Sequence, residues 1–401
     1  MLIGLVGKPN TGKSTFYNAS TLASVPVASY PFTTIEPNIG VAHVRRKCVC
    51  EEFGVEDNPK NSYCVEGDRF IPFRLVDTAG LVPGAWEGRG LGNRFLDKIS
   101  RADALIHLVD ASGATDLEGN LIPPGTHDPL EDVTFLEDEL ARWFEGIISK
   151  YWTKTAKKVE MLKRPLAASL HETLSGLNFS LKQLRDTVES IDKDPYKPGR
   201  WKKNDLLTLA RTLLRVARPI IIGANKVDMV QAEENIERIR ETGDVVFPVS
   251  AVSELALRKA AERKLIHYLP GDSDFAVSAP GDLSEEQVRG LKRLRERVLT
   301  RFGGTGVQQI LNHAVFKALD YIVVYPVSDV DSLADTQRNV LPDAYLLPEG
   351  SKVIDLAGEI HSEIAAKIIY AIDARSRRRL SPSHKLKDND IIQIVSAAGP
   401  V

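Results

Sequence analysis

The sequence predicts an α/β fold with a mostly parallel sheet, a helical insertion and a C-terminal α+β module. Short apolar runs alternate with helical patterns along most of the chain, and two long helical stretches interrupt this alternation. The runs that we interpret as strands are residues 2–6, 73–76, 104–109, 219–224 and 245–249. Strands that alternate with helices indicate a parallel sheet with helices on both faces.

The first interruption covers residues 131–216. Apolar side chains recur there at helical spacing in two sets, Leu136, Leu140, Phe144 and Ile148, then Leu206, Leu209, Leu213 and Val216. Two prolines and a glycine in residues 192–205 break the pattern between the two sets. We therefore expect a helical hairpin inserted between two strands of the sheet, and more helices in residues 254–318.

The C-terminal region has a different texture. The β-rich run YIVVYPV is followed by LPEG, by a predicted helical stretch over residues 355–374 and by the closing strand IIQIV. We predict three domains: residues 1–130 with 217–318, the helical insertion 131–216, and the module 319–401.

Composition narrows the class of protein. Of 401 residues, 43% are apolar and 26% charged, as in ordinary globular chains, which excludes a disordered, collagenous or disulfide-scaffold protein. The net charge of -2 gives no general attraction to nucleic acid. No apolar run is long enough for a membrane span, and no signal peptide is evident. The three cysteines fit a reducing compartment, so we expect a cytoplasmic protein. We also expect a monomer, because no coiled-coil seam is clear.

The segment GKPNTGKS matches the phosphate-binding pattern G-x-x-x-x-G-K-[ST] between a predicted strand and a predicted helix. The glycines allow backbone angles that turn the loop amides toward a polyphosphate. Lys13 can reach the β- and γ-phosphates, and the Ser14 hydroxyl can bind Mg²⁺. The residues predicted to surround the phosphates are Gly7, Lys8, Pro9, Asn10, Thr11, Gly12, Lys13, Ser14 and Thr15.

The segment DTAG, residues 77–80, follows the apolar run FRLV. Asp77 at a strand end is suited to hold the Mg²⁺ shell through water. Gly80 can offer its amide to a γ-phosphate and move when that phosphate leaves.

The segment NKVD, residues 225–228, follows the predicted strand PIIIGA. Asp228 would accept hydrogen bonds from N1–H and the exocyclic amine of guanine, a donor pair that adenine lacks. Asn225 would brace the loop and Lys226 would lie over the base. Ser250 and Ala251, after VVFPV, would form the last base-contacting turn.

The order of these motifs resembles a TRAFAC-class GTPase. YPFTTIEPN, residues 30–38, resembles the first switch of the Obg family, and GLVPGAWEGRGLGNRFL, residues 80–96, resembles its second switch. With the insertion and the C-terminal module, the chain resembles the YchF/Obg-like branch in an archaeal-type form. This resemblance implies a P-loop GTPase domain and a Mg²⁺ site completed by Thr34, with Thr33 as the close alternative.

The resemblance also bears on nucleotide choice. Bacterial and eukaryotic members carry a glutamate where Asp228 stands and prefer ATP, so we expect GTP and GDP here, with ATP as the alternative. Leu81 replaces the water-orienting glutamine of other GTPases, so intrinsic hydrolysis should be slow. An RNA-binding scaffold with little hydrolysis is a further alternative. Asn10 either helps to hold K⁺ or only stabilises the loop, and no catalytic base is assigned.

LPEG, residues 347–350, followed by Asp355, Ala357, Ile360 and His361, resembles TGS domains, which are ubiquitin-like β-grasp modules. We expect His361 to be structural. A cationic run follows, for which we predict contact with RNA or the ribosome: Arg375, Arg377, Arg378, Arg379, His384, Lys385 and Lys387. The resemblance thus implies a Mg²⁺-dependent GTP-hydrolysing switch associated with translation.

The three cysteines lie between the first switch and the strand before Asp77. Cys48, Cys50 and Cys64 could hold Zn²⁺ if Asp57 or a water completed four ligands. The irregular spacing favours the other interpretation, a β-hairpin with free thiols.

Overall fold

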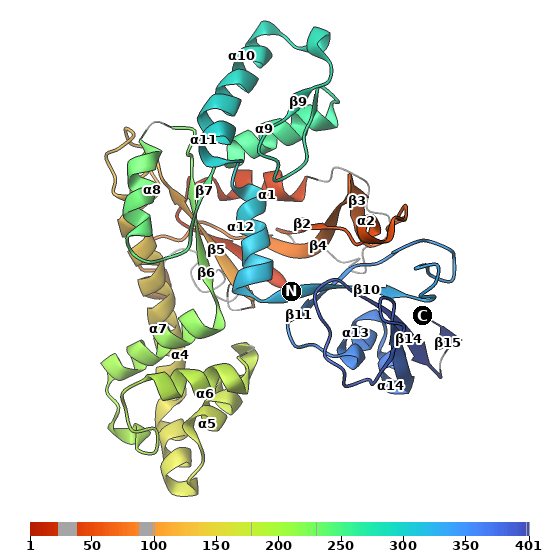
Figure 1. The fold of residues 1–401 in the computed structure, drawn as a ribbon. Coiled ribbons are helices and arrows are strands. Elements are labelled where there is room, and N and C mark those ends of the chain that lie inside the picture. Colours follow the sequence, from red (N-terminus) through yellow and green to blue (C-terminus); the bar gives the residue numbers. More distant parts are fainter. Residues whose placement is uncertain are drawn as a thin grey trace. The chain divides into compact units, whose positions relative to one another are not determined.

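The fold is that of a computed structural model, drawn in Figure 1. The residues that the structure describes are 1–22, 38–87, 99, 101–177, 179–229, 231–397 and 399–400. The chain forms two compact units, each described by itself below. Unit 1 comprises Met1–Ala19 and Leu75–Ile310, and unit 2 comprises Ser20–Arg74 and Leu311–Val401. This division differs from the three predicted domains, whose boundaries stay a prediction.

A parallel sheet forms the centre of unit 1. Strands β1 (Leu2–Val6), β5 (Ala104–Asp110), β6 (Ile220–Asn225) and β7 (Val246–Val249) pair in parallel in that order. In register, Leu5 lies opposite Ile106, which lies opposite Ile221. All seven residues of β5 are buried, as expected for a parallel strand covered on both faces. The predicted P-loop α/β fold is confirmed.

The sheet continues beyond β1 through three more strands. Its full order is β2-β4-β1-β5-β6-β7, with β3 paired antiparallel to β4. The bounds of these strands are Ile39–Lys47 for β2, Tyr63–Val65 for β3 and Asp68–Asp77 for β4. The short helix α2 (Cys50–Phe53) lies between β2 and β3 in sequence.

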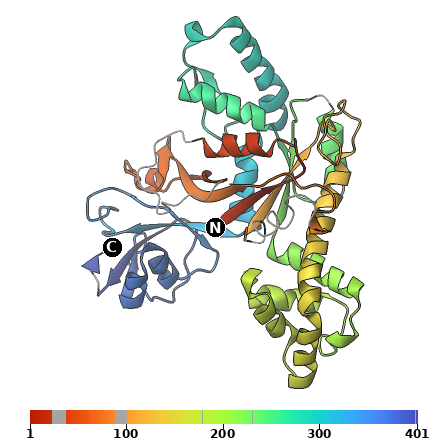
Figure 2. The same cartoon turned by 180° about the vertical axis from the view of Figure 1, so that it is seen from behind.

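The helical insertion belongs to unit 1 and has four helices. They are α4 (Pro129–Leu162), α5 (Leu166–Thr173), α6 (Leu181–Ser190) and α7 (Lys203–Ala217). Asp128 caps α4 by accepting from the Leu130 amide at 3.1 Å, and Pro129 occupies the first helical turn. Figures 1 and 2 both show α4 leading from the sheet to the other three helices. Its 34 residues therefore connect the sheet to the insertion.

The insertion has an apolar core that includes residues of the sheet domain. Seven of the eight side chains predicted to face inward are buried there, but Val216 is 40% exposed. Leu214 is buried in its place, because the apolar stripe of α7 follows Leu206, Leu209, Leu213 and Leu214 around the helix. Val6, Leu81 and Ala85 join the same core.

Further helices lie before the C-terminal module in sequence. They are α1 (Lys13–Thr21), α8 (Ala232–Arg240), α9 (Ala251–Glu262), α10 (Glu285–Leu294), α11 (Thr300–Phe302) and α12 (Val307–His313). A two-stranded ribbon of β8 (Ile266–His267) and β9 (Ala276–Val277) lies between α9 and α10 in sequence. No described helix is long and apolar enough to cross a membrane.

The C-terminal module in unit 2 is a mixed sheet in the order β11-β10-β14-β12-β13, with β15 paired to β14. β10 and β14 pair in parallel and the other neighbours antiparallel. Its strands are β10 (Tyr321–Val327), β11 (Tyr345–Pro348), β12 (Ile368–Asp373), β13 (Arg379–Leu380), β14 (Asp390–Ser396) and β15 (Gly399–Pro400). The predicted β-grasp TGS module is confirmed.

Two helices, α13 (Val353–Ile360) and α14 (Ser362–Lys367), precede β12. The predicted helical stretch 355–374 is therefore too long, since residues 368–373 form a strand. The β-branched and aromatic residues of IIY favour the strand, where β12 pairs with β14. The His361 Nδ1 caps α14 by accepting from the Glu363 amide at 3.2 Å, which is a structural role.

Candidate functional site

The phosphate loop joins β1 to α1 and takes a shape that requires glycine at two places. Gly7 has φ 143° and Gly12 has φ 95°. A Cβ on Gly7 would lie 2.4 Å from the Leu108 carbonyl oxygen, and one on Gly12 would lie 2.3 Å from the Asn225 Nδ2. Any other residue would displace the strand β5 or the side chain of Asn225.

Lys13 begins α1 and its side chain returns to the loop. Its Nζ donates to the Lys8 carbonyl oxygen at 2.6 Å. Burial lowers the pKa of Lys13 to about 8, and nearby Asp77 opposes this shift. A phosphate oxygen in the loop would offer this ammonium a charged acceptor and stabilise its protonated form.

Ser14 and Asp77 face each other at the start of α1 and the end of β4. The Ser14 hydroxyl donates to Asp77 Oδ2 at 2.9 Å. Asp77 Oδ1 is buried and has no hydrogen-bond partner among the described residues. A buried carboxylate oxygen left without a partner is costly unless water or a cation satisfies it. This donor set fits Mg²⁺, which prefers hard oxygen ligands and retains water. Thr33 and Thr34 lie outside the described residues.

Asn225 at the end of β6 connects the two halves of the site. Its Nδ2 donates to the Thr11 carbonyl at 2.8 Å, and its Oδ1 accepts from the Ala251 amide at 3.1 Å. One side chain therefore joins the phosphate loop to the turn after β7.

Asp228 is held by the same turn. The Ser250 hydroxyl donates to Asp228 Oδ1 at 2.8 Å, and Ser250 also caps α9. The carboxylate is half-buried. A positioned, half-buried carboxylate is what recognition of two adjacent N–H donors requires.

Lys226 has a left-handed backbone, with φ 68°, and its Nζ lies 2.8 Å from Asp110 Oδ2. Asp110 is fully buried at the end of β5 and also accepts from the Ser112 amide and the Thr115 hydroxyl. Sequence reasoning missed Asp110. The sequence contains one indication of its role: Asp110 directly follows the predicted strand that precedes the strand before NKVD, and parallel strands bring their carboxyl ends together.

The Lys8 side chain is held by helix α4 and by the segment between β5 and α4. Its Nζ forms a buried ion pair with Asp132 of α4 at 2.8 Å, both side chains being at most 2% exposed, and donates to the Thr115 carbonyl at 2.7 Å. The His127 Nε2 lies 2.8 Å from the other Asp132 oxygen. Because these contacts engage the Lys8 ammonium, only the Lys8 backbone remains available for the predicted contact with nucleotide. Asp132 was missed because it looks like an ordinary helix-start residue.

His107 on β5 lies near these two lysines. Burial lowers its pKa to about 3, with the charges of Lys13 and Lys8 adding to the effect. The ring is therefore neutral at physiological pH, and it adds no positive charge to the phosphate site.

Asn10 is held by the segment between β5 and α4. Its Nδ2 donates to the Gly119 carbonyl at 2.9 Å, and its own φ is 62°. A Cβ on Gly119 would lie 2.6 Å from Pro9. The amide nitrogen of Asn10 thus stabilises the loop, while its oxygen is the atom that a K⁺ ion would use.

The beginning of the second switch contacts the insertion helix. The Glu139 carboxylate on α4 accepts from the Gly84 amide at 2.8 Å and the Trp86 amide at 3.0 Å. The Leu81 amide donates to the Gly7 carbonyl at 3.1 Å, while its side chain is 1% exposed. A Cβ on Gly80 would lie 2.7 Å from the Pro9 nitrogen. Residues 88–96 of this switch lie outside the described residues.

The cationic side chains of the TGS module are exposed, but they are not all free charges. Arg375 donates to both Glu52 oxygens at 2.7 Å, and Arg377 lies 2.8 Å from Asp331. Among the described residues, no carboxylate pairs with Arg378, Arg379, Lys385 or Lys387. Arg379 lies over the Tyr370 ring at 4.6 Å, an aromatic neighbour that the sequence did not place beside the run.

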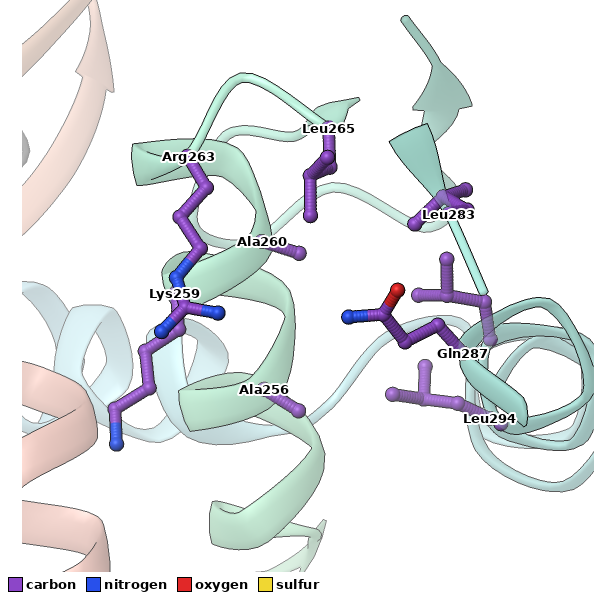
Figure 3. A pocket seen from close by; sticks show the side chains of 10 residues that line it. Ala256, Lys259, Ala260, Arg263, Leu265, Leu283, Gln287 and Leu294 are labelled. Carbon is purple, nitrogen blue, oxygen red and sulfur yellow. The ribbon is translucent and has the colours of Figure 1, made fainter. Parts of the chain in front are cut away.

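An apolar pocket of about 350 Å³ lies elsewhere in unit 1 (Figure 3). Ala256 and Ala260 of α9 face Gln287 and Leu294 of α10 across it, while Lys259 and Arg263 point away. None of the predicted site residues lines this pocket.

Comparisons with known proteins agree with the geometry. Residues 2–136 match the family described as 50S ribosome-binding GTPase, and residues 223–329 match "Obg-like GTPase YGR210-like, G4 motif-containing domain". Residues 337–396 match the TGS domain.

Relatives extend over most of the chain. An uncharacterized GTP-binding protein of Methanocaldococcus jannaschii is 46% identical over 99% of both chains. The ribosome-binding ATPase YchF of Haemophilus influenzae is 30% identical over 69% of this chain and 72% of its own. The crystal structure of a GTP binding protein from Pyrococcus horikoshii OT3 is 37% identical, with a TM-score of 0.77 over 99% of this chain and 100% of that one. The chain therefore belongs to the YchF/Obg-like family of P-loop GTPases.

Proposed function

We propose that this GTPase is a Mg²⁺-dependent molecular switch that hydrolyses GTP and associates with the ribosome. The observation that carries the choice of guanine is Asp228, which Ser250 holds at 2.8 Å in a loop that Asn225 braces against the phosphate loop. A carboxylate held in this way would lose its partners with adenine, so the discrimination should be substantial.

The roles of the phosphate-side residues follow from their positions. The amides of the loop and the Lys13 ammonium would bind the β- and γ-phosphates, with Ser14 and Asp77 supporting Mg²⁺. When bound, Mg²⁺ would neutralise charge on those phosphates. Thr34 and the Gly80 amide are proposed to complete the triphosphate-bound state.

The switch proposal is supported by the contacts of α4. Glu139 binds two amides of the second switch, and Leu81 and Ala85 pack in the core of the insertion. A change in residues 80–86 on loss of the γ-phosphate would therefore alter the packing of the insertion.

Hydrolysis is expected to be slow without an activating partner. Leu81 is buried and cannot orient water by hydrogen bonding, and no catalytic base is assigned. If the Asn10 oxygen helps to hold K⁺, replacing Na⁺ by K⁺ should stimulate GTP hydrolysis in the wild type and not in Asn10→Ala.

Ribosome association is supported by the description of the family that residues 2–136 match and by the name of the Haemophilus YchF relative. Arg378, Arg379, Lys385 and Lys387, which pair with no carboxylate among the described residues, supply a surface that attracts a phosphate backbone. Such a partner would place the protein in the cytoplasm, and it is proposed to act as a monomer.

The first experiment is titration calorimetry with GTP, GDP, ATP and ADP in Mg²⁺ and K⁺. Guanine nucleotides should bind at least about tenfold more tightly, some 1.4 kcal/mol. Asp228→Glu should shift the preference toward adenine, whereas the exposed-site control Asp282→Glu should not. Equal or tighter adenine binding by the wild type would favour the ATP-hydrolysing alternative.

The second experiment measures co-sedimentation with archaeal ribosomes in the GDP form and in a non-hydrolysable triphosphate form. A switch should bind differently in the two forms. Equal binding, with hydrolysis at background in the presence of ribosomes and K⁺, would favour the RNA-binding scaffold.

A further inference from the structure

Unit 2 brings all three cysteines of the chain together with one aspartate. Cys48 follows β2, Cys50 begins α2, Asp57 lies in the loop after α2, and Cys64 lies in β3. Their sulfur and oxygen ligand atoms all lie within 4.8 Å of one another. The spacing of these residues in the sequence did not predict this arrangement, because Asp57 reaches the cysteines only if the loop after α2 turns back toward the end of β2.

The distances suit one tetrahedral metal ion. The Cys50 and Cys64 sulfurs are 3.9 Å apart, and the Cys48 sulfur is 3.2 Å from Asp57 Oδ2. Zn–S bonds of about 2.3 Å and Zn–O bonds of about 2.1 Å place tetrahedral ligands roughly 3.5–3.8 Å apart. A disulfide needs a sulfur–sulfur distance of about 2.05 Å, and all three thiols are free.

A buried arginine orients the aspartate. The Arg69 Nη1 donates to Asp57 Oδ2 at 2.8 Å, its Nε donates to Ser62, and its Nη2 donates to the Leu341 carbonyl. Arg69 is fully buried, so its direction is fixed by these three acceptors. A charged partner that fixes a ligating carboxylate is typical of a metal's outer shell.

Charge supports the same conclusion. Three thiolates and one carboxylate carry four negative charges, of which Arg69 and Zn²⁺ together would neutralise three. Cys48 and Cys50 are 4% and 7% exposed, and Cys64 is half-buried, which leaves a way in for the ion. Four protein ligands in a closed set indicate a structural rather than a catalytic site.

The turns around the cluster are also fixed. The Cys48 amide donates to the Gly67 carbonyl at 2.8 Å, which joins the end of β2 to the turn between β3 and β4. Gly54 ends α2 in a left-handed conformation, with φ 61°, and directs the chain back toward Asp57. Backbone contacts therefore assemble the ligands before an ion binds.

We propose that Cys48, Cys50, Asp57 and Cys64 form a structural Zn²⁺ site that links the end of β2 and helix α2 to strand β3. The site shares no ligand with the proposed nucleotide switch, whose described residues, including Ser14, Asp77, Asn225 and Asp228, lie in unit 1.

The test uses cobalt substitution in the purified full-length chain. Because these are the only cysteines in the sequence, any thiolate-to-Co²⁺ charge-transfer band must come from this cluster. We expect one Co²⁺ per chain with intense tetrahedral bands, displacement of Co²⁺ by Zn²⁺, and protection of all three thiols from alkylation until a chelator is added. A weak octahedral spectrum without the thiolate band would overturn the proposal.

Variants assign the ligands. Cys64→Ser should abolish the thiolate band or reduce it strongly. Asp57→Asn should weaken Co²⁺ binding at least about tenfold, because changes to residues that only support a metal ligand already cost about that much. Asp186→Asn, at an exposed position of α6, should have no effect. If a variant does not fold, the wild-type titration still decides.

Two further outcomes count against the site. A non-reduced chain lighter by two hydrogens would show a disulfide between two of the three cysteines instead. Zinc that a brief chelator wash removes without exposing the thiols to alkylation would be adventitious. GTP binding is measured in the same samples, so a failed zinc site is distinguishable from a failed nucleotide site.

Discussion

The two halves of the nucleotide site are built in different ways. The phosphate half depends on backbone shape, with Gly7 and Gly12 in conformations that admit no side chain, and the Lys8–Asp132 pair anchors it to helix α4. The base half depends on side chains, and Asn225 ties it to the phosphate loop. The comparison leads us to expect that phosphate binding is coupled to the insertion and that base selection is coupled to phosphate binding.

Breaking the anchor of the phosphate half should give the largest effect. Lys8→Met leaves the buried Asp132 without its cation, and breaking a buried ion pair costs about 3–5 kcal/mol of unfolding free energy. Denaturant unfolding measures the loss. Lys8→Met with Asp132→Asn should recover much of it, and an unchanged single variant would show that the pair is not an anchor.

Cutting the link between the halves should give the next largest effect. Asn225→Ala removes two hydrogen bonds, worth about 1–3 kcal/mol together, so GTP affinity should fall roughly 5- to 150-fold. Calorimetric titration measures it, with the exposed Asn204→Ala as control. If ATP and GTP affinities fell equally, Asn225 would serve phosphate binding alone.

Weakening the contact between the second switch and α4 should have a smaller effect. Glu139→Gln retains one acceptor but loses the charge that holds two amides, so we expect a loss of about 1–2 kcal/mol in unfolding free energy. Protection of the Gly84 and Trp86 amides in hydrogen exchange should fall as well. Glu189→Gln, exposed on α6, is the matched control, and equal behaviour of the two variants would contradict the role of Glu139.

The smallest expected effect is the pH dependence of GTP affinity, which tests the role of Lys13 in the phosphate half of the site. Lys13 is proposed to bind phosphate as the protonated amine, and burial lowers its pKa to about 8. GTP affinity should therefore be constant below about pH 8 and fall above it, by at most tenfold per pH unit. Calorimetry above pH 8 in buffers of different ionisation enthalpy should show proton uptake on binding. No uptake would mean that Lys13 keeps its charge without nucleotide.

Local motifs made much of the site predictable. GKPNTGKS, DTAG and NKVD each lie directly after an apolar strand, and parallel strands bring their carboxyl ends to one edge of the sheet. The residues that the sequence missed, Asp110, Asp132 and Glu139, carry no motif. Asp132 and Glu139 act on partners far away in the chain, for which one sequence gives no signal, whereas Asp110 was marked only by its place at the carboxyl end of a parallel strand.

The errors have a similar origin. The predicted helix over residues 355–374 continued through β12, because a short apolar run fits helix and strand equally until a neighbouring strand pairs with it. Val216 has the spacing of a residue in the apolar stripe of α7. The packing of the neighbouring helices determines which side of α7 is buried, and Val216 lies outside that side.

The sequence by itself determined the fold class, the GTPase motifs and the TGS module, because these depend on residues that are near one another in the chain. The tertiary structure decided that Lys8 pairs with Asp132 of α4, that Glu139 accepts from the amides of Gly84 and Trp86, and that three scattered cysteines meet Asp57. These contacts depend on the course of the loops and on the burial of charged groups. Burial strengthens an ion pair or a set of metal ligands only after the chain has folded.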